Sequence, residues 1–271
     1  VVMGNNKSYI INVKLRPNYL YLMSNGDVDF LSSTPYTLLK KADGTPLYRD
    51  KQGNVLATPK VPVGLVVSQS KRLAMALKPL VGTFPWYTGG GGGPCNYKTY
   101  PKSGGWLLTE ADVAAIAQDM DGYRYTWEAS GSADGTTIKA NQPTLYPAFY
   151  QAAHYREKLV ADGVTLTGPM ATKNWYLPSG GEWNLVRLNL GYSDGTKTPS
   201  FFVTYKWASY AYYLALLDVG GVPCGITYVS SSTELPGSSY YGPLMSDGNM
   251  SMTDRAWGTS LSMTVIPFVK Y

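Results

Sequence analysis

Few residues in this 271-residue sequence could carry out catalysis or bind a metal ion. The single histidine, His154, lies in a stretch with helical periodicity, where a lone histidine is more often structural than catalytic. A Ser-His-Asp triad could recruit only His154 as its base. His, Cys and carboxylate residues do not cluster at the spacing of a metal site. We therefore expect no catalytic residues, no metal and no cofactor.

Two motifs invite a ligand-binding interpretation that their context does not support. The five glycines from Gly89 to Gly93 are not followed by Lys-Ser/Thr and do not join a strand to a helix, so we predict a surface loop and not a phosphate site. Asp27 and Asp29 lack the carboxylate-rich run and terminal Glu of a calcium loop, which favours an ordinary turn. Beside the glycines, Trp86 and Tyr87 could form either an exposed platform for a ligand or part of the core.

The cysteines and carboxylates leave alternatives open. Cys95 and Cys224 lie far apart in sequence and either pair in an oxidising compartment or remain buried thiols. A pair of carboxylates of the glycosidase type depends on a spacing in three dimensions that the sequence does not reveal.

Composition indicates a loop-rich domain of short strands. Aromatic residues make up 13% of the chain and charged residues 15%, and there are 29 glycines and 18 prolines. The 23 tyrosines suit a recognition surface, although we expect most of them to fill half-buried sheets. The net charge of +5 is concentrated in residues 1–80, so it does not favour polyanion binding by the C-terminal part. No apolar run approaches the roughly 20 residues of a transmembrane helix.

Several segments have clear secondary-structure patterns. The sequence predicts strands at residues 7–16, 19–23, 63–67, 73–77, 226–231, 240–245 and 261–269, with one more beginning at Met250. It predicts helices at residues 109–120, 147–161 and 207–218, and a polar loop over residues 122–145. Ser246-Asp247-Gly248-Asn249 has the composition of a hairpin turn.

The strongest local signal lies between Asn174 and Gly191. Trp175 and Tyr176 suit the end of a strand, Pro178 ends the pairing, and Ser179 with Glu182 forms a Ser-x-x-Glu capping box at the start of a helix. We expect Trp175 and Trp183 to contribute to the centre of the core.

Three ordered motifs resemble the FISUMP family of bacterial surface proteins. They are W-Y-L-P-S-x-x-E-W at residues 175–183, S-S-T-E at residues 231–234 and PVGLVVSQSKRLAMALKPL at residues 62–80. The resemblance covers residues 19–271 and implies one α+β domain, C-type-lectin-like and related to formylglycine-generating enzymes, with loops, short antiparallel sheets and about four helices. Residues 7–16 resemble the last strand of a fimbrillin-like domain, so residues 1–18 are expected to be a remnant of that domain or a connector.

The resemblance also implies where a ligand would bind. In the C-type-lectin-like fold the last strands and their loops face the ligand, which selects Tyr240, Tyr241, Asp247, Asn249, Arg255 and Trp257 in this chain. Alternatively, Trp257 is buried in the core and does not contact a ligand. Glu234 of the S-S-T-E motif is expected to fix a loop through backbone hydrogen bonds. The copper chemistry of formylglycine-generating enzymes needs two closely spaced cysteines and is not expected here.

These expectations favour a cell-surface adhesin or pilus-tip module of a Bacteroidetes-type bacterium. It would be extracellular, anchored to the outer membrane or part of a pilus, and would recognise a host or microbial glycan or a surface protein, with no role for nucleic acid. One alternative is a structural pilin subunit assembled by strand addition. Another is an enzyme on the formylglycine-generating scaffold, which a deep pocket with converging carboxylates would favour.

Overall fold

A computed structural model shows helices and antiparallel sheets in one chain, which confirms the α+β class. The structure describes residues 19–30, 39–40, 46–47, 60–90, 93–103, 108–190, 208–224, 227–237, 239–241, 244–246, 249–251, 254–256 and 263–271. The predicted strand at residues 7–16 and the connector at residues 1–18 lie outside these ranges.

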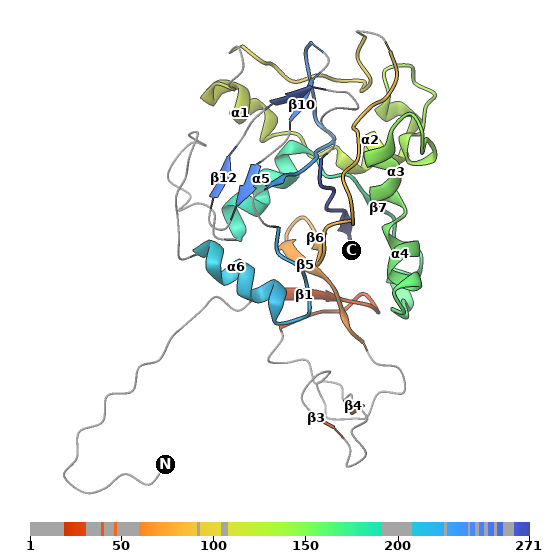
Figure 1. The fold of residues 1–271 in the computed structure, drawn as a ribbon, viewed down its shortest axis with the longest axis vertical. Coiled ribbons are helices and arrows are strands. Elements are labelled where there is room, and N and C mark those ends of the chain that lie inside the picture. The colour runs from red at the N-terminus through yellow and green to blue at the C-terminus, as the bar shows by residue number, and fades with distance from the viewer. Residues whose placement is uncertain are drawn as a thin grey trace, which may run out of the picture.

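A six-stranded antiparallel sheet lies at the centre of the described structure (Figure 1). Its strand order is β2-β1-β5-β6-β14-β7, with β1 at Leu20–Met23, β2 at Val28–Phe30, β5 at Pro62–Ser68, β6 at Leu73–Ala76, β7 at Trp175–Tyr176 and β14 at Phe268–Lys270. The predicted hairpin of residues 63–67 and 73–77 is confirmed as β5 and β6. Almost every residue of these two strands is buried, because both faces of the sheet are covered.

The C-terminal strand is an inner strand of this sheet. β14 pairs antiparallel with β6 on one side and with β7 on the other, so that Phe268 lies opposite both Met75 and Tyr176. The last residues of the chain therefore join two segments that are about a hundred residues apart in sequence.

The described residues contain six α-helices, where the sequence suggested about four. They are α1 at Glu110–Ile116, α2 at Gly122–Trp127, α3 at Pro147–Ala153, α4 at Tyr155–Ala161, α5 at Gly180–Asn189 and α6 at Ala208–Leu217. Three short 3-10 turns occupy Ala129–Gly131, Lys139–Asn141 and Gly168–Ala171. In Figure 1, α3 and α4 lie on one side of the sheet and α5 and α6 on the other; α2 and α3 contact β7, and α5 contacts β5.

Two features account for the extra helices. The predicted helix at residues 147–161 breaks at His154, whose backbone leaves the α region at φ −94° and ψ 18°. Nδ1 of His154 lies 2.8 Å from the carbonyl oxygen of Tyr150, and the two rings stack at 4.1 Å. The segment predicted as a polar loop contains α2, whose Tyr125 is fully buried, so tertiary packing stabilises a helix that the local sequence did not indicate.

The C-terminal third forms two small antiparallel sheets. Their strands are β8 at Thr227–Tyr228, β9 at Glu234–Leu235, β10 at Ser239–Tyr241, β11 at Leu244–Ser246, β12 at Asn249–Ser251 and β13 at Asp254–Ala256. One sheet has the order β13-β10-β9 and the other β12-β11-β8, while β3 at Leu39–Lys40 and β4 at Pro46–Leu47 form a separate pair. Ser246 pairs with Asn249, which agrees with the predicted hairpin.

Aromatic side chains dominate the core. Trp175 and Trp183 are both fully buried, as expected, and contact Tyr155 at 4.8 Å and Phe268 at 5.0 Å between ring centroids. Seven of the described tyrosines are buried: Tyr21, Tyr100, Tyr125, Tyr146, Tyr155, Tyr176 and Tyr240. Among the described helices, none has both the length and the apolar character needed to cross a membrane.

Candidate functional site

The structure brings three of the six predicted ligand residues into one small sheet. Tyr240 and Tyr241 lie in β10, and Arg255 in β13 pairs with Tyr240. Asn249 begins β12 in the other small sheet. Asp247 and Trp257 lie outside the described residues.

Tyr240 is part of the core and does not face a ligand. Its side chain is fully buried, and its ring stacks on Trp86 with centroids 5.5 Å apart and planes 11° from parallel. Trp86 is also fully buried and packs edge-on against Phe149 at 5.1 Å. Of the two candidate platform residues beside the glycine run, Trp86 therefore belongs to the core, while Tyr87 is half-buried. The stacking surface expected at Tyr240 is not present.

The segment from Ser230 to Glu234 connects three parts of the core. The carbonyl oxygen of Ser231 accepts a hydrogen bond from Nε1 of Trp86 at 2.7 Å, and that of Ser230 accepts one from Nε1 of Trp183 at 3.2 Å. The carbonyl oxygen of Ser232 accepts from Nδ2 of Asn96 at 2.7 Å. Because each indole N–H needs a partner when it is buried, this segment fixes both tryptophans.

Glu234 holds a loop through backbone hydrogen bonds, as expected. Its carboxylate accepts the backbone N–H of Cys95, with both oxygens at 2.9 Å, and also the backbone N–H of Asn96. The side chain is buried, and this burial raises the pKa of Glu234 above its ordinary value, partly offset by the hydrogen bonds. The loop at residues 95–96 is thereby attached to β9, at the base of the C-terminal sheets.

A buried lysine lies near this loop and was not anticipated from the sequence. Nζ of Lys139 donates to Oγ of Ser132 at 2.7 Å and lies 5.4 Å from the centre of the Tyr146 ring. Burial lowers the pKa of Lys139 to about 8. The pair resembles a serine nucleophile with a lysine base, but Lys139 is fully buried, and Oγ of Ser132 donates to the carbonyl oxygen of Thr137 at 2.7 Å. The buried position of Lys139 indicates a structural role.

Both cysteines are free and buried, which resolves the alternative left by the sequence. Burial raises the pKa of the Cys95 thiol to about 11 and that of the Cys224 thiol to about 12. Because a thiol, unlike a thiolate, is a poor nucleophile, neither residue is poised for covalent chemistry.

Two carboxylates converge at the start of α5. The capping box is confirmed: the backbone N–H of Ser179 donates to Oε2 of Glu182 at 2.9 Å. Oγ of Ser179 donates to the carbonyl oxygen of Asp119 at 2.6 Å. Oγ1 of Thr233 accepts the N–H of Gly180 at 2.7 Å and donates to the carboxylate of Asp119.

The environment of these carboxylates favours their protonated forms. Both side chains are completely buried, and burial raises the pKa of Asp119 to about 6 and that of Glu182 to about 7. Oε1 of Glu182 also accepts the hydroxyl of Tyr176 at 2.8 Å. Complete burial keeps a substrate away from both groups, so the cluster serves to connect α5, the end of α1 and the S-S-T-E segment.

Asp27 and Asp29, which lack the sequence pattern of a calcium loop, form ion pairs with Lys60. Nζ of Lys60 lies 2.7 Å from Oδ2 of Asp27 and 3.1 Å from Oδ2 of Asp29. Asn25 completes the turn, since its Oδ1 accepts the backbone N–H of Asp27 at 3.1 Å. In the part of the chain that the structure describes, no three His, Cys, Asp or Glu side chains are placed to hold a metal ion.

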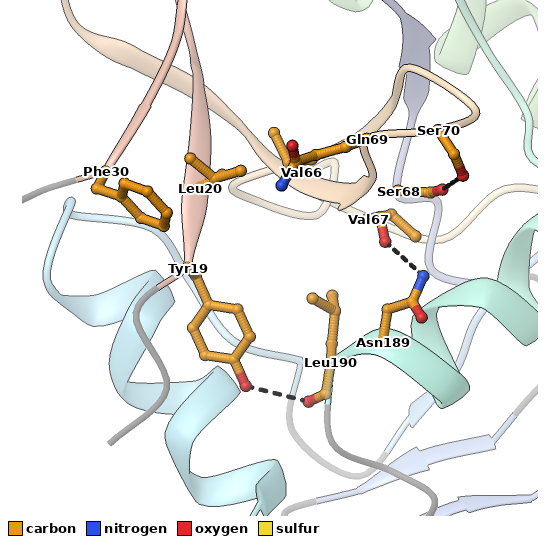
Figure 2. A pocket seen from close by; sticks show the side chains of 10 residues that line it. All are labelled: Tyr19, Leu20, Phe30, Val66, Val67, Ser68, Gln69, Ser70, Asn189 and Leu190. Atoms are coloured by element: carbon orange, nitrogen blue, oxygen red, sulfur yellow. Dashed lines mark hydrogen bonds between the residues drawn. The ribbon is translucent and has the colours of Figure 1, made fainter. Parts of the chain in front are cut away.

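A surface groove of about 470 Å³ lies between the sheet and the end of α5 (Figure 2). Its lining residues are Tyr19, Leu20, Phe30, Val66, Val67, Ser68, Gln69, Ser70, Asn189 and Leu190. They come from β1 and the residue before it, from β2, from the end of β5 and the turn after it, and from the C-terminal end of α5, so no short sequence motif could have indicated the groove.

Comparison with family models, curated proteins and solved structures finds no match for the chain.

Proposed function

We propose that this chain is the binding module of a bacterial cell-surface adhesin with a C-type-lectin-like fold. It would recognise a host or microbial glycan or a surface protein through the loops of residues 232–258, in an extracellular setting. Within that region, Tyr241, Asp247, Asn249, Arg255 and Trp257 are the proposed contacts. Tyr240 is no longer among them because it is fully buried.

One observation carries this proposal: the small sheet β13-β10-β9 is attached to the core through β9 and β10. Glu234 precedes β10 and is held by the loop at residues 95–96, while Tyr240 in β10 stacks on Trp86. Binding proteins commonly present variable loops on a scaffold that is fixed in this way. The buried positions of Asp119, Glu182 and Lys139 support a binding function over a catalytic one.

A glycan array and a mucin-binding assay with the purified chain would test this function. We expect Arg255→Ala and Trp257→Ala to abolish specific binding while leaving the circular dichroism spectrum unchanged. The control is Glu157→Ala, an exposed position on α4. Binding that survives both loop variants would contradict the proposed site, and a folded chain that binds neither glycans nor surface proteins would contradict the function.

A structural pilin subunit is the second candidate, and the position of β2 favours it. Among the described strands, β2 is the last on its side of the sheet, and Phe30 at its end is 39% exposed. Strand addition at this edge would join two copies through residues 7–16. Light scattering would detect polymers of the chain, and deletion of residues 1–18 should abolish them; a chain that stays monomeric at all concentrations would argue against this candidate.

A further inference from the structure

We propose that the groove between β1, β2, the end of β5 and the end of α5 binds a neutral carbohydrate. This site lies apart from the C-terminal loops, and the inference does not depend on the function proposed for them. Its volume of about 470 Å³ falls within the range of about 300–1,000 Å³ that is typical of small-molecule sites.

The groove has no charged lining. None of its ten lining residues is Asp, Glu, Lys, Arg or His. Among the described lining residues, the only ionisable group is the phenol of Tyr19, and burial raises its pKa to about 12, so it stays neutral at physiological pH. A phosphate, a carboxylate or an ammonium group would lose hydration here without gaining an ionic partner. The groove therefore favours an uncharged ligand.

Aromatic and polar groups are separated across the groove. In Figure 2, Tyr19, Leu20 and Phe30 lie at one side, while Ser68, Ser70 and Asn189 lie at the other. A sugar ring has the matching division: its C–H face packs on an aromatic ring, and its hydroxyls bond to amide and hydroxyl groups. A purely apolar ligand would displace water from the polar side without replacing its hydrogen bonds.

The polar side is held in place before a ligand binds. Nδ2 of Asn189 donates to the carbonyl oxygen of Val67 at 2.9 Å, and the hydroxyls of Ser68 and Ser70 lie 3.2 Å apart. The hydroxyl of Tyr19 donates to the carbonyl oxygen of Leu190 at 3.4 Å, which leaves its oxygen able to accept. These contacts fix the groups that would orient a ligand and lower the entropy cost of binding.

Gln69 supplies an adaptable contact at the rim. It is exposed in the turn after β5, and its amide makes no hydrogen bond within the part of the chain that the structure describes. A free amide offers two donors and an acceptor, which suits a pair of neighbouring sugar hydroxyls.

Saturation-transfer NMR and calorimetry with lactose and maltotriose, compared with glucuronate and glucosamine, would test the inference. We expect binding of a neutral sugar, at least about fivefold weaker binding by Phe30→Ala and by Gln69→Ala, and little binding of the charged sugars. Both positions are exposed, so the variants should fold. The matched control is Val81→Ala, an apolar residue that is 86% exposed and does not line the groove.

Absence of neutral-sugar binding by the folded chain would overturn the inference, and so would binding that Phe30→Ala and Gln69→Ala leave unchanged. If Arg255→Ala and Trp257→Ala abolish sugar binding while the groove variants retain it, the sugar binds at the C-terminal loops. That result would contradict the groove as the binding site but not the function proposed for the loops. If only the groove variants lose sugar binding, the groove is supported as the carbohydrate site, and the C-terminal loops do not bind the sugar.

Discussion

A single carboxylate, that of Glu234, attaches the loop at residues 95–96 to the C-terminal sheets. It accepts two buried backbone N–H groups, and hydrogen bonds to a charged acceptor are stronger than neutral ones. We expect Glu234→Ala to lower the free energy of unfolding by about 2–4 kcal/mol, because both N–H groups would lose their partner inside the protein. Urea denaturation would measure the change.

The conservative variant separates the hydrogen bonds from the charge. Glu234→Gln keeps one acceptor oxygen, so it should cost less than Glu234→Ala. Glu157→Ala, at an exposed position, should change the stability by less than about 0.5 kcal/mol. If Glu234→Ala lowers the free energy of unfolding by no more than this control does, the loop at residues 95–96 is held by other contacts.

The two buried carboxylates at the start of α5 should make stability depend on pH. Burial raises the pKa of Asp119 to about 6 and that of Glu182 to about 7, above the values of about 4 in an unfolded chain. The folded state then binds more protons than the unfolded state between these values, so its stability falls as pH rises through the folded pKa. We expect the melting temperature to be higher at about pH 5 than at about pH 7.

Replacing one carboxylate would identify the source of this dependence. Glu182→Gln resembles the protonated side chain and should flatten the change in melting temperature between about pH 7 and pH 5. Glu157→Gln, an exposed position, should leave it as in the parent chain. A parent chain whose stability rises with pH over this interval would contradict the protonated state assigned to the cluster.

At the scale of elements, α5 is positioned by a close backbone contact at its N-terminus. Gly181 donates its N–H to the carbonyl oxygen of Asp119 at 2.9 Å, and a Cβ atom at Gly181 would lie 2.2 Å from that oxygen. We expect Gly181→Ala to destabilise the protein by about 1–3 kcal/mol or more, although alanine stabilises an isolated helix. Chemical denaturation would show the sign of the effect.

The matched control is Gly90→Ala, the same change at a glycine where an added Cβ meets nothing within 4 Å. Its effect on stability should be close to zero. Equal effects of the two substitutions would mean that α5 can shift away from Asp119 without cost.

The elements that could be predicted from the sequence are those with local signals. The capping box at Ser179 and Glu182 and the hairpin of β5 and β6 depend on residues within one segment, and the structure confirms them. The formation of α2 was missed because it depends on packing with distant parts of the chain. The break at His154 was missed although its contacts with Tyr150 are local, because helical periodicity continues through it.

The candidate site shows the same division. The S-S-T-E motif was identified, and the backbone contacts of Glu234 were predicted correctly. Periodicity did not reveal that Tyr240 would be buried, because its partner, Trp86, is more than a hundred residues away in sequence. The groove lined by Tyr19, Phe30, Gln69 and Asn189 had no signal for the same reason: its residues meet only in the folded chain.

At the scale of the whole molecule, the last strand, β14, joins parts of the central sheet that are far apart in sequence. β14 lies between β6 and β7, and Phe268 contacts Trp183 on α5, so the C-terminus connects the two sides of the core. Long-range pairing of this kind slows folding, and we expect the central sheet to behave as one cooperative unit.

Removal of β14 should therefore unfold the central sheet as a whole. Deleting residues 267–271 would leave β6 and β7 without the strand between them, and we expect loss of the near-ultraviolet circular dichroism of the buried tryptophans. Hydrogen exchange should become fast in residues 62–68, 73–76 and 175–176 together.

The milder variant Phe268→Ala should keep the fold but lower the free energy of unfolding by about 3–5 kcal/mol, because its ring is fully buried. Val81→Ala, at an exposed site, should leave the free energy of unfolding almost unchanged. If residues 62–76 stay protected from hydrogen exchange after residues 267–271 are deleted, β5 and β6 fold independently of the C-terminus. The sheet would then consist of two cooperative units.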